Sequence, residues 1–240
     1  MAGPRPETTG ARAAAPSRRE PAGKIIVSQG LRHEQARGLG REHLQRVGEA
    51  RPVFRRGAGP GVVVVHEVPG ITPAVLAFAL EVVDAGFIVV MPSLVGTPGE
   101  AWNAGNVLSS MARVCVSREY ATWSTGRTSP LTGWLRALAA DLHAQLGGPG
   151  LGADLNLAPT DLASVKGRVA AGCPVLGLRY TGDKLVGSRF DTLRCELGEG
   201  FLVVELPGKG HSVVTEQRDE AAVQRVLTFF RERLVVPDPP

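Results

Sequence analysis

The sequence predicts an α/β protein with a mostly parallel sheet and helices on both faces of that sheet. Three short apolar runs rich in β-branched residues predict buried strands, at Val62–Val65, Phe87–Pro92 and Phe201–Leu206. A segment with helical spacing lies between the first two runs. Strand, helix and strand within about 30 residues form a right-handed βαβ unit. The chain of 240 residues, 43% of them hydrophobic, is long enough for one large domain with a buried core.

The first half of the chain contains the predicted βαβ unit. In chain order, the expected elements are a short edge strand at 24–27, one or two turns of helix at 41–49, a turn at 55–61, strand 62–65, a helix from Thr72 to Gly86, strand 87–92 and a long excursion with little regular structure at 93–130. The turn is rich in Gly and Arg. Thr72 and Pro73 have the residue types of a helix N-cap and first helical position. Gly86 ends the apolar helical pattern.

The second half alternates helices with strands. The expected elements are helix 131–146, helix 161–171, strand 173–180, a helix near 185–197, strand 201–206 and a terminal helix at about 218–233. Leucines and Trp134 follow one face of the first of these helices, and the Gly-rich segment after Leu146 ends it.

Cysteine content and hydropathy indicate a cytoplasmic protein without a metal or cofactor. Cys115, Cys173 and Cys195 lie far apart and form no C-x-x-C pair, which favours reduced thiols over disulfides or a zinc site. The longest apolar stretch, at 74–90, is interrupted by two acidic residues, too early for a transmembrane helix. The N-terminus has no apolar core of a secretion signal, and an organellar transit peptide is the alternative interpretation of its Arg-rich composition.

Charge is distributed unevenly along the chain. Residues 1–60 contain 12 Lys and Arg against 5 acidic residues, whereas the remainder is mildly acidic. Such a basic segment raises the question of nucleic-acid binding, but its Arg residues are scattered and no aromatic residues are interleaved with them. We therefore expect a solvated face and no nucleic-acid or membrane partner.

Two polar residues follow the last two predicted strands. Asp183 comes after strand 173–180, and His211 comes after strand 201–206 in a Gly-rich turn. An acid after one buried strand and a His after the next is the order of acyl-transfer enzymes with a Ser or Cys nucleophile earlier in the chain. Neither Gly-x-Ser-x-Gly nor Gly-x-Cys-x-Gly occurs between a strand and a helix upstream. The alternatives are an Asx-turn role for Asp183 and an exposed loop position for His211.

The segment Val62–Gly70, the sequel Asp84–Pro92, and the settings of Asp183 and His211 together resemble the dienelactone hydrolase family. The resemblance covers about Gly61 to Leu234 and implies an α/β-hydrolase fold that hydrolyses esters or lactones. It implies that His211 is the general base and that Asp183 orients its imidazole.

The resemblance also assigns roles to the loop after the first buried strand. Glu67 matches a family Glu that contacts the resting thiol nucleophile, and the backbone N–H of Val68 would donate to the oxyanion. A plain solvated carboxylate is the alternative for Glu67. We expect the adjacent His66 to be a packing or loop residue, because strand alternation points it away from its neighbour.

The segment that carries the nucleophile in this family is missing from the sequence pattern. The helix at 131–146 ends in Gly147–Ala153, where the nucleophile strand should start, and the chain goes directly to 154–159 and the next helix. We infer the loss of a strand–helix–strand block of at least roughly 30 residues, which would include the middle of the sheet. The expected organisation is a disordered leader at 1–22, an edge segment at 23–60, and an α/β-hydrolase domain at 61–236 that is incomplete between 153 and 154.

No other residue is a convincing replacement for the nucleophile, which stays unknown. Cys173 opens its strand at the edge opposite the catalytic loops, Cys195 falls on a peripheral helix, and Cys115 has the pattern of a small buried hydrophobe. An Arg in 113–127 is a candidate for binding a substrate carboxylate. Two functions remain: a hydrolase with an ester or lactone substrate, or an inactive or truncated relative that at most binds a small molecule.

Overall fold

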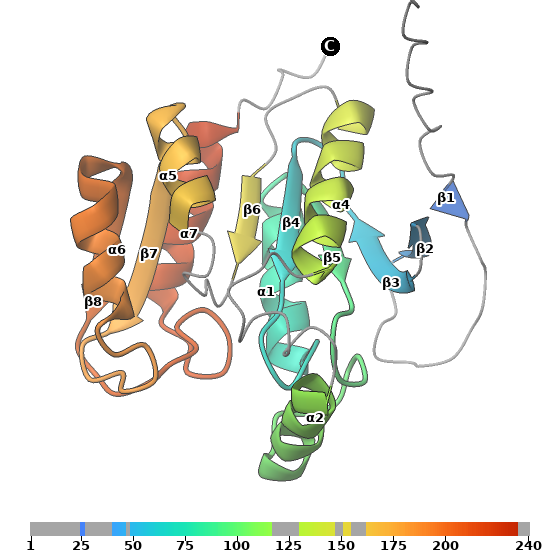
Figure 1. Cartoon of the computed structure of the whole chain (residues 1–240), viewed down its shortest axis with the longest axis horizontal. Helices are drawn as coiled ribbons and strands as arrows, with labels where there is room; N and C mark the ends of the chain where they lie inside the picture. The colour runs from blue at the N-terminus through green and yellow to red at the C-terminus, as the bar shows by residue number, and fades with distance from the viewer. Residues whose placement is uncertain are drawn as a thin grey trace, which may run out of the picture.

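The computed structural model describes residues 25–26, 40–46, 49–116, 130–146, 151–154 and 162–234, with side chains at 51–112, 131–146, 162–163 and 165–234. Its strands form two sheets (Figure 1). The larger sheet has six strands in the order β1-β2-β3-β5-β4-β6, and the smaller one pairs β7 with β8.

The predicted βαβ unit is present in the larger sheet. Strand β4 (Gly61–Val65), helix α1 (Pro73–Asp84) and strand β5 (Ile88–Pro92) follow one another, and the two strands pair in parallel. Thr72 caps α1, because its hydroxyl accepts a hydrogen bond from the N–H of Val75 at 3.3 Å. This confirms the strand, the helix and its cap as expected from the sequence.

The N-terminal edge of this sheet is antiparallel, and here the predicted helix at 41–49 is wrong. Strands β1 (Ile25–Ile26), β2 (Gly40–Arg46) and β3 (Glu49–Arg56) pair in succession, and β3 pairs with β5. The β2–β3 register runs from Gly40 opposite Arg55 to Arg46 opposite Glu49. A ladder of this length overrides the weak local helix preference of the segment, because sheet pairing depends on partners elsewhere in the chain.

A strand that the sequence pattern did not reveal lies beside β4. Strand β6 (Leu151–Asp154) pairs in parallel with β4, with Leu151 opposite Val62 and Asp154 opposite Val65. The expectation that no strand follows the helix of 131–146 is therefore wrong. The Gly-rich segment has the composition of a turn, and only pairing with β4 makes it a strand. The loss of the rest of the strand–helix–strand block, between 153 and 154, stays a prediction.

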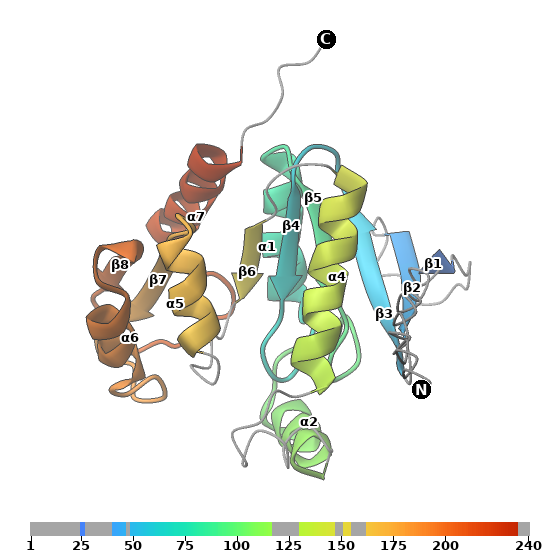
Figure 2. The same cartoon turned by 45° about the horizontal axis from the view of Figure 1, so that its top comes forward.

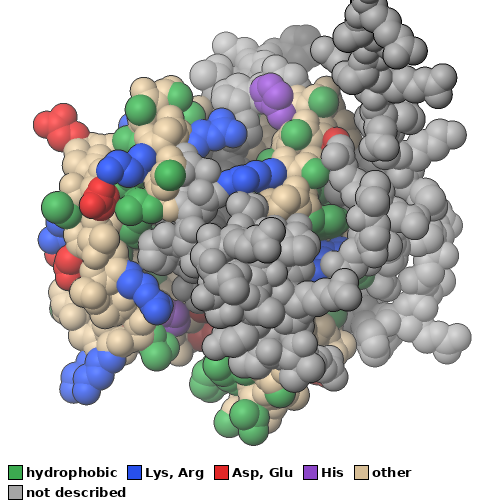
Figure 3. Space-filling view, viewed as in Figure 1, with side chains coloured by type: hydrophobic (Ala, Val, Ile, Leu, Met, Phe, Trp, Pro, Cys, Tyr) green, Lys and Arg blue, Asp and Glu red, His purple; other side chains and the backbone are tan. Residues whose placement is uncertain are grey.

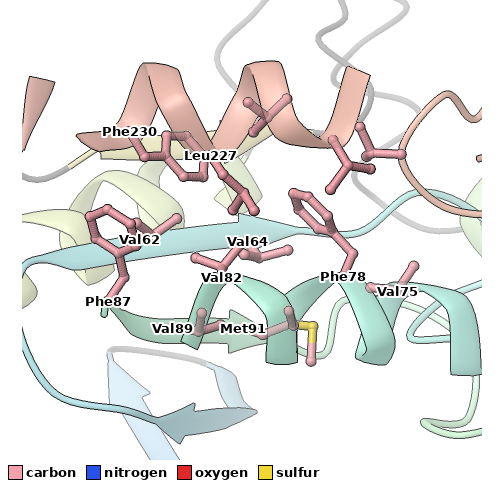
Figure 4. Packing of buried hydrophobic residues seen from close by; sticks show 14 of the residues in the cluster. Val62, Val64, Val75, Phe78, Val82, Phe87, Val89, Met91, Leu227 and Phe230 are labelled. Carbon is pink, nitrogen blue, oxygen red and sulfur yellow. The ribbon is translucent and has the colours of Figure 1, made fainter. Parts of the chain in front are cut away.

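Helices cover both faces of the larger sheet, as Figure 2 shows for α4 on one side and α1 on the other. Helix α4 (Pro130–Leu146) packs Trp134, Leu138 and Leu142 against the strands. On the opposite face, α1 and α7 (Glu220–Arg233) enclose the main core (Figure 4). Its fully buried members include Phe78 and Phe87, and Phe230 of α7 contacts Phe87 edge to face with ring centroids 6.0 Å apart.

The smaller sheet carries the C-terminal part of the chain. Strands β7 (Val175–Tyr180) and β8 (Phe201–Leu206) pair in parallel over their full length. Helices α5 (Leu162–Ala170) and α6 (Arg189–Leu197) supply a local apolar cluster. Leucines of β7 and β8 also pack on the main core, which connects the two sheets. Among the described residues no strand pairs with the outer edge of β6 or of β7.

The excursion after β5 contains a helix that the sequence analysis did not predict. Helix α2 (Ala104–Val116) lies at the lower end of the molecule in Figure 1, the end toward which the arrowhead of β6 points. The buried Ser110 of α2 donates to the carbonyl of Pro69 at 3.0 Å. Leu108 and Met111 are exposed, and Figure 3 shows apolar side chains gathered at this end. Val107, Leu108, Met111 and Val114 recur at helical spacing, so a signal for this helix was available in the sequence.

Within the described residues, no helix combines the length and the apolar character needed to cross a membrane.

Candidate active site

The parallel pairing of β7 and β8 brings two loops together at one edge of the smaller sheet. Asp183 follows β7, His211 follows β8, and the N–H of Gly182 donates to the carbonyl of Gly208 at 2.8 Å, which joins the two loops. The Nδ1 atom of His211 lies 2.7 Å from Oδ2 of Asp183. The expected contact between these two residues is thus confirmed, at the carboxyl ends of neighbouring strands where α/β sheets hold their ligands.

Asp183 is held in a fixed position by its own turn. Its side chain is only 2% exposed, and its Oδ1 atom accepts from the N–H groups of Leu185 at 2.8 Å and Val186 at 3.4 Å. The Asx-turn alternative and the contact with His211 are therefore both realised, by different oxygens of one carboxylate. An ionised carboxylate only accepts, so Nδ1 of His211 carries the proton that it donates to Asp183. This tautomer leaves Nε2 of His211 as the basic atom.

Glu67 approaches the other ring nitrogen of His211. Its Oε2 atom lies 3.6 Å from Nε2, and its side chain is 11% exposed. Oε1 accepts from the hydroxyl of Ser212. Burial raises the pKa of the Glu67 carboxyl, and the nearby charges of Glu216 and Asp183 act in the same direction, whereas Ser212 and His211 oppose the shift. The solvated-carboxylate alternative is wrong for this residue.

The loop 66–70 presents an unused backbone donor. The carbonyl of Glu67 accepts from the N–H of Gly70 at 2.9 Å, and Ser110 binds the carbonyl of Pro69. Within the described part of the chain, the N–H of Val68 has no hydrogen-bond partner. A free N–H in the loop that carries Glu67 is a group that can stabilise a developing oxyanion.

His66 connects this loop to the end of β5. The residue is buried; its Nδ1 donates to the carbonyl of Glu67 at 2.9 Å, and its Nε2 accepts from the N–H of Leu94 at 2.9 Å. These two bonds require the neutral imidazole, since protonation would place a second donor opposite the N–H of Leu94. His66 is therefore a structural residue, as the sequence analysis expected.

We expect His66 to make the stability of the protein sensitive to mild acid. Burial lowers the pKa of His66 below its ordinary value of 6.5. The His66 imidazole therefore binds a proton more readily in the unfolded chain than in the folded one. Its contribution to the free energy of unfolding is fully present above about pH 6.5 and decreases as the pH falls below that value. Urea denaturation of the native protein and of His66→Leu, at pH 7.5 and pH 5.5, measures this. The loss on acidification should be smaller in the variant; equal losses would contradict this role.

Two residues that support the site were missed from the sequence. The side-chain oxygen of Gln217 accepts from the N–H groups of His211 at 3.3 Å and Ser212 at 2.9 Å, which holds the histidine loop in place. Ser212 itself binds Glu67. Adjacency to His211 was an available signal for Ser212, whereas nothing in the sequence marks Gln217.

Neither of the two cysteines whose side chains the structure describes contacts this site. Cys173 and Cys195 are exposed, the first before β7 and the second on α6. Cys115 lies in α2, but its side chain and the range 117–129 fall outside the described residues. The expected arginine that binds a carboxylate therefore stays a prediction. Within the described side chains, no group of three or more His, Cys, Asp or Glu could hold a metal ion.

Comparison with known proteins identifies the fold. No family model matches the chain, and no curated protein matches it. Among solved structures, it is similar to a dienelactone hydrolase from Anabaena variabilis (TM-score 0.54, 15% identity, 82% of this chain and 98% of that one). It is also similar to the dienelactone hydrolase-like promiscuous phosphotriesterase P91 from metagenomic libraries (TM-score 0.55, 17% identity, 82% and 98%). A cold-adapted esterase from an Arctic intertidal metagenomic library gives a TM-score of 0.53 at 18% identity, over 82% and 95%. The chain therefore has the α/β-hydrolase fold that dienelactone hydrolase-like proteins and esterases share.

Proposed function

We propose that this protein is a dienelactone hydrolase-like hydrolase of ester or lactone bonds, in which His211 is the general base. The observation that supports this most strongly is the 2.7 Å contact of His211 Nδ1 with the buried carboxylate of Asp183. That contact fixes the tautomer and orientation of the imidazole and stabilises the imidazolium formed when Nε2 takes a proton. The free N–H of Val68 is placed in the same loop as Glu67 and would stabilise the negative charge of a tetrahedral intermediate.

Water is the nucleophile in this proposal. Among the described side chains, the carboxylate of Glu67 lies nearest to Nε2 of His211, and neither a Ser nor a Cys is hydrogen-bonded to that nitrogen. His211 would remove a proton from water as it attacks the carbonyl carbon. General-base catalysis contributes about 10²–10⁴-fold, so we expect turnover above the uncatalysed rate by about that factor, which is slow for an esterase. A small ester or lactone is the proposed partner.

An inactive relative that binds a small molecule is the second candidate. The observation that favours it is again Glu67, whose carboxylate occupies the space beside Nε2 where an activated hydroxyl or thiol would have to lie. In that case the Glu67–Asp183–His211 site would bind a ligand without converting it.

The substitution Asp183→Asn tests whether the site catalyses hydrolysis. An amide can donate to Nδ1 and so favours the wrong imidazole tautomer, with the proton on Nε2. We expect turnover of a chromogenic ester to fall about 10²-fold, a loss at the lower end of the range for general-base catalysis. The exposed Asp191→Asn on α6 is the matched control and should retain the native rate. If Asp183→Asn has the same turnover as the native protein, the result would favour the inactive relative that binds a small molecule.

A further inference from the structure

We propose that Glu67 is the general acid of this site and protonates the leaving oxygen while His211 activates water. This inference rests on the proposed function and assigns a catalytic part to a carboxyl group that general-base hydrolysis alone leaves unused. It also specifies the substrate class, because a general acid matters only for leaving groups that depart as strong bases.

The contact between Glu67 and His211 is favourable when one of the two groups holds a proton. Because Nδ1 of His211 donates to Asp183, its Nε2 atom presents a lone pair toward Oε2 of Glu67, 3.6 Å away. An ionised carboxylate also presents only lone pairs. Two acceptors facing each other in a half-buried site repel, so the arrangement is favourable when one of them holds a proton.

The burial of Glu67 favours that proton on the carboxyl group. Ser212 donates to Oε1, which marks this oxygen as the acceptor and leaves Oε2 as the oxygen that carries the proton. Burial raises the pKa of the Glu67 carboxyl. Asp183 from the β7 loop and Glu216 from the segment before α7 add negative charge nearby, which also favours the neutral carboxyl, whereas the hydrogen bond from Ser212 and the charge of His211 oppose the shift. The working form in this proposal is a neutral base at Nε2 beside a protonated acid at Oε2.

With a neutral base next to an acid, the site can hydrolyse an ester in two steps. Water first adds to the carbonyl carbon, and the leaving group then departs. The water oxygen bonds to the carbonyl carbon while a water proton moves to Nε2 of His211. The carbonyl oxygen becomes an oxyanion near the N–H of Val68. When the oxyanion collapses, the bond from carbon to the leaving oxygen breaks, and that oxygen takes the proton from Oε2 of Glu67. The proton on His211 then returns to Glu67 across the 3.6 Å gap, directly or through solvent, which restores both groups.

The substrate class follows from this last proton transfer. A nitrophenolate is a weak base and leaves without a proton. Phenolate is more basic, and an alkoxide from an alkyl ester or a lactone is more basic still, so these leaving groups gain increasingly from a proton donor. Glu67 therefore suits the protein to alkyl esters and lactones, and a nitrophenyl ester tests His211 without testing Glu67.

Hydrolysis of 4-nitrophenyl acetate and of phenyl acetate by the native protein, Glu67→Gln and Glu232→Gln tests the assignment. The amide in Glu67→Gln keeps the size of the side chain and its acceptor for Ser212 but cannot transfer a proton. We expect Glu67→Gln to lower turnover of phenyl acetate about 10²-fold and to change that of the nitrophenyl ester less than about 3-fold. Glu232, an exposed residue of α7, is the matched carboxylate-to-amide control and should leave both rates at the native value.

The outcomes separate the two proposals. Equal losses on both esters in Glu67→Gln, or no loss on phenyl acetate, would overturn the acid role of Glu67. Turnover of the nitrophenyl ester by the native protein would still support His211 as the general base. No turnover of either ester above the His211→Ala background would overturn the proposed function itself. If Glu67→Gln fails to fold, substituted phenyl acetates are compared with the native protein alone. A rate that changes little with the basicity of the leaving phenol supports the acid, and a steep decline overturns it.

Discussion

Replacing His211 by alanine is expected to lower ester hydrolysis by about 10²–10⁴-fold, to the uncatalysed rate. Alanine removes Nε2, the atom that takes the proton of water, while Asp183 keeps its bonds to the N–H groups of Leu185 and Val186. The fold should persist for this reason. Initial rates with 4-nitrophenyl acetate, at protein concentrations well above those used for ordinary esterases, measure the loss.

His143→Ala is the matched control for that experiment. His143 lies on the exposed side of α4, which packs on the larger sheet away from the β7 and β8 loops. Its removal should leave the rate unchanged. Equal losses in the two variants would indicate hydrolysis by unspecific surface histidines, and an unchanged rate in His211→Ala would refute the general base.

Replacing Phe78 by alanine is expected to destabilise the protein by about 3–5 kcal/mol, the range for a buried phenylalanine. Phe78 is fully buried between α1 and α7, and alanine leaves a cavity in the core that also joins the two sheets. Native proteins have a total stability of roughly 5–15 kcal/mol. The edges of β6 and β7 lack strand partners among the described residues, so we expect the native value near the lower limit and the variant largely unfolded.

Urea denaturation followed by circular dichroism measures this effect. Leu108→Ala on α2 is the control, because its side chain is 72% exposed and its loss should change stability by about 0.5 kcal/mol or less. Phe78→Leu fills part of the cavity and should fall between the two. A Phe78→Ala protein that unfolds at the native midpoint would show that the two helices do not form one core.

The sequence was sufficient for the elements whose own pattern determines them. The βαβ unit was predictable because Val62–Val65 and Phe87–Pro92 are too apolar for anything but buried strands, and because Thr72 and Pro73 mark the start of the helix. The loops with Asp183 and His211 were predictable for a related reason: each follows a recognisable strand, and parallel neighbours bring their carboxyl ends to one edge.

The elements that were missed depend on partners elsewhere in the chain. Strand β6 forms from a Gly-rich segment because β4 offers it a parallel edge, and β2 forms because β3 pairs with it over seven residues. Neither partner can be identified from local composition. The same limit applies to Gln217, whose contacts with the histidine loop exist only in the folded chain. The short approach of Glu67 to His211 also had no sequence signal beyond the family resemblance.

The most direct test of a water nucleophile is the release of nitrophenolate from 4-nitrophenyl acetate during the first turnover. Without an acyl-enzyme intermediate, product should appear linearly from the start, at a rate that iodoacetamide leaves unchanged even if Cys115 is alkylated. Treatment of the native protein and His211→Ala in parallel separates site chemistry from surface reactions. A burst equal to the protein concentration, abolished by iodoacetamide, would show that a cysteine of the chain is the nucleophile and would contradict this account.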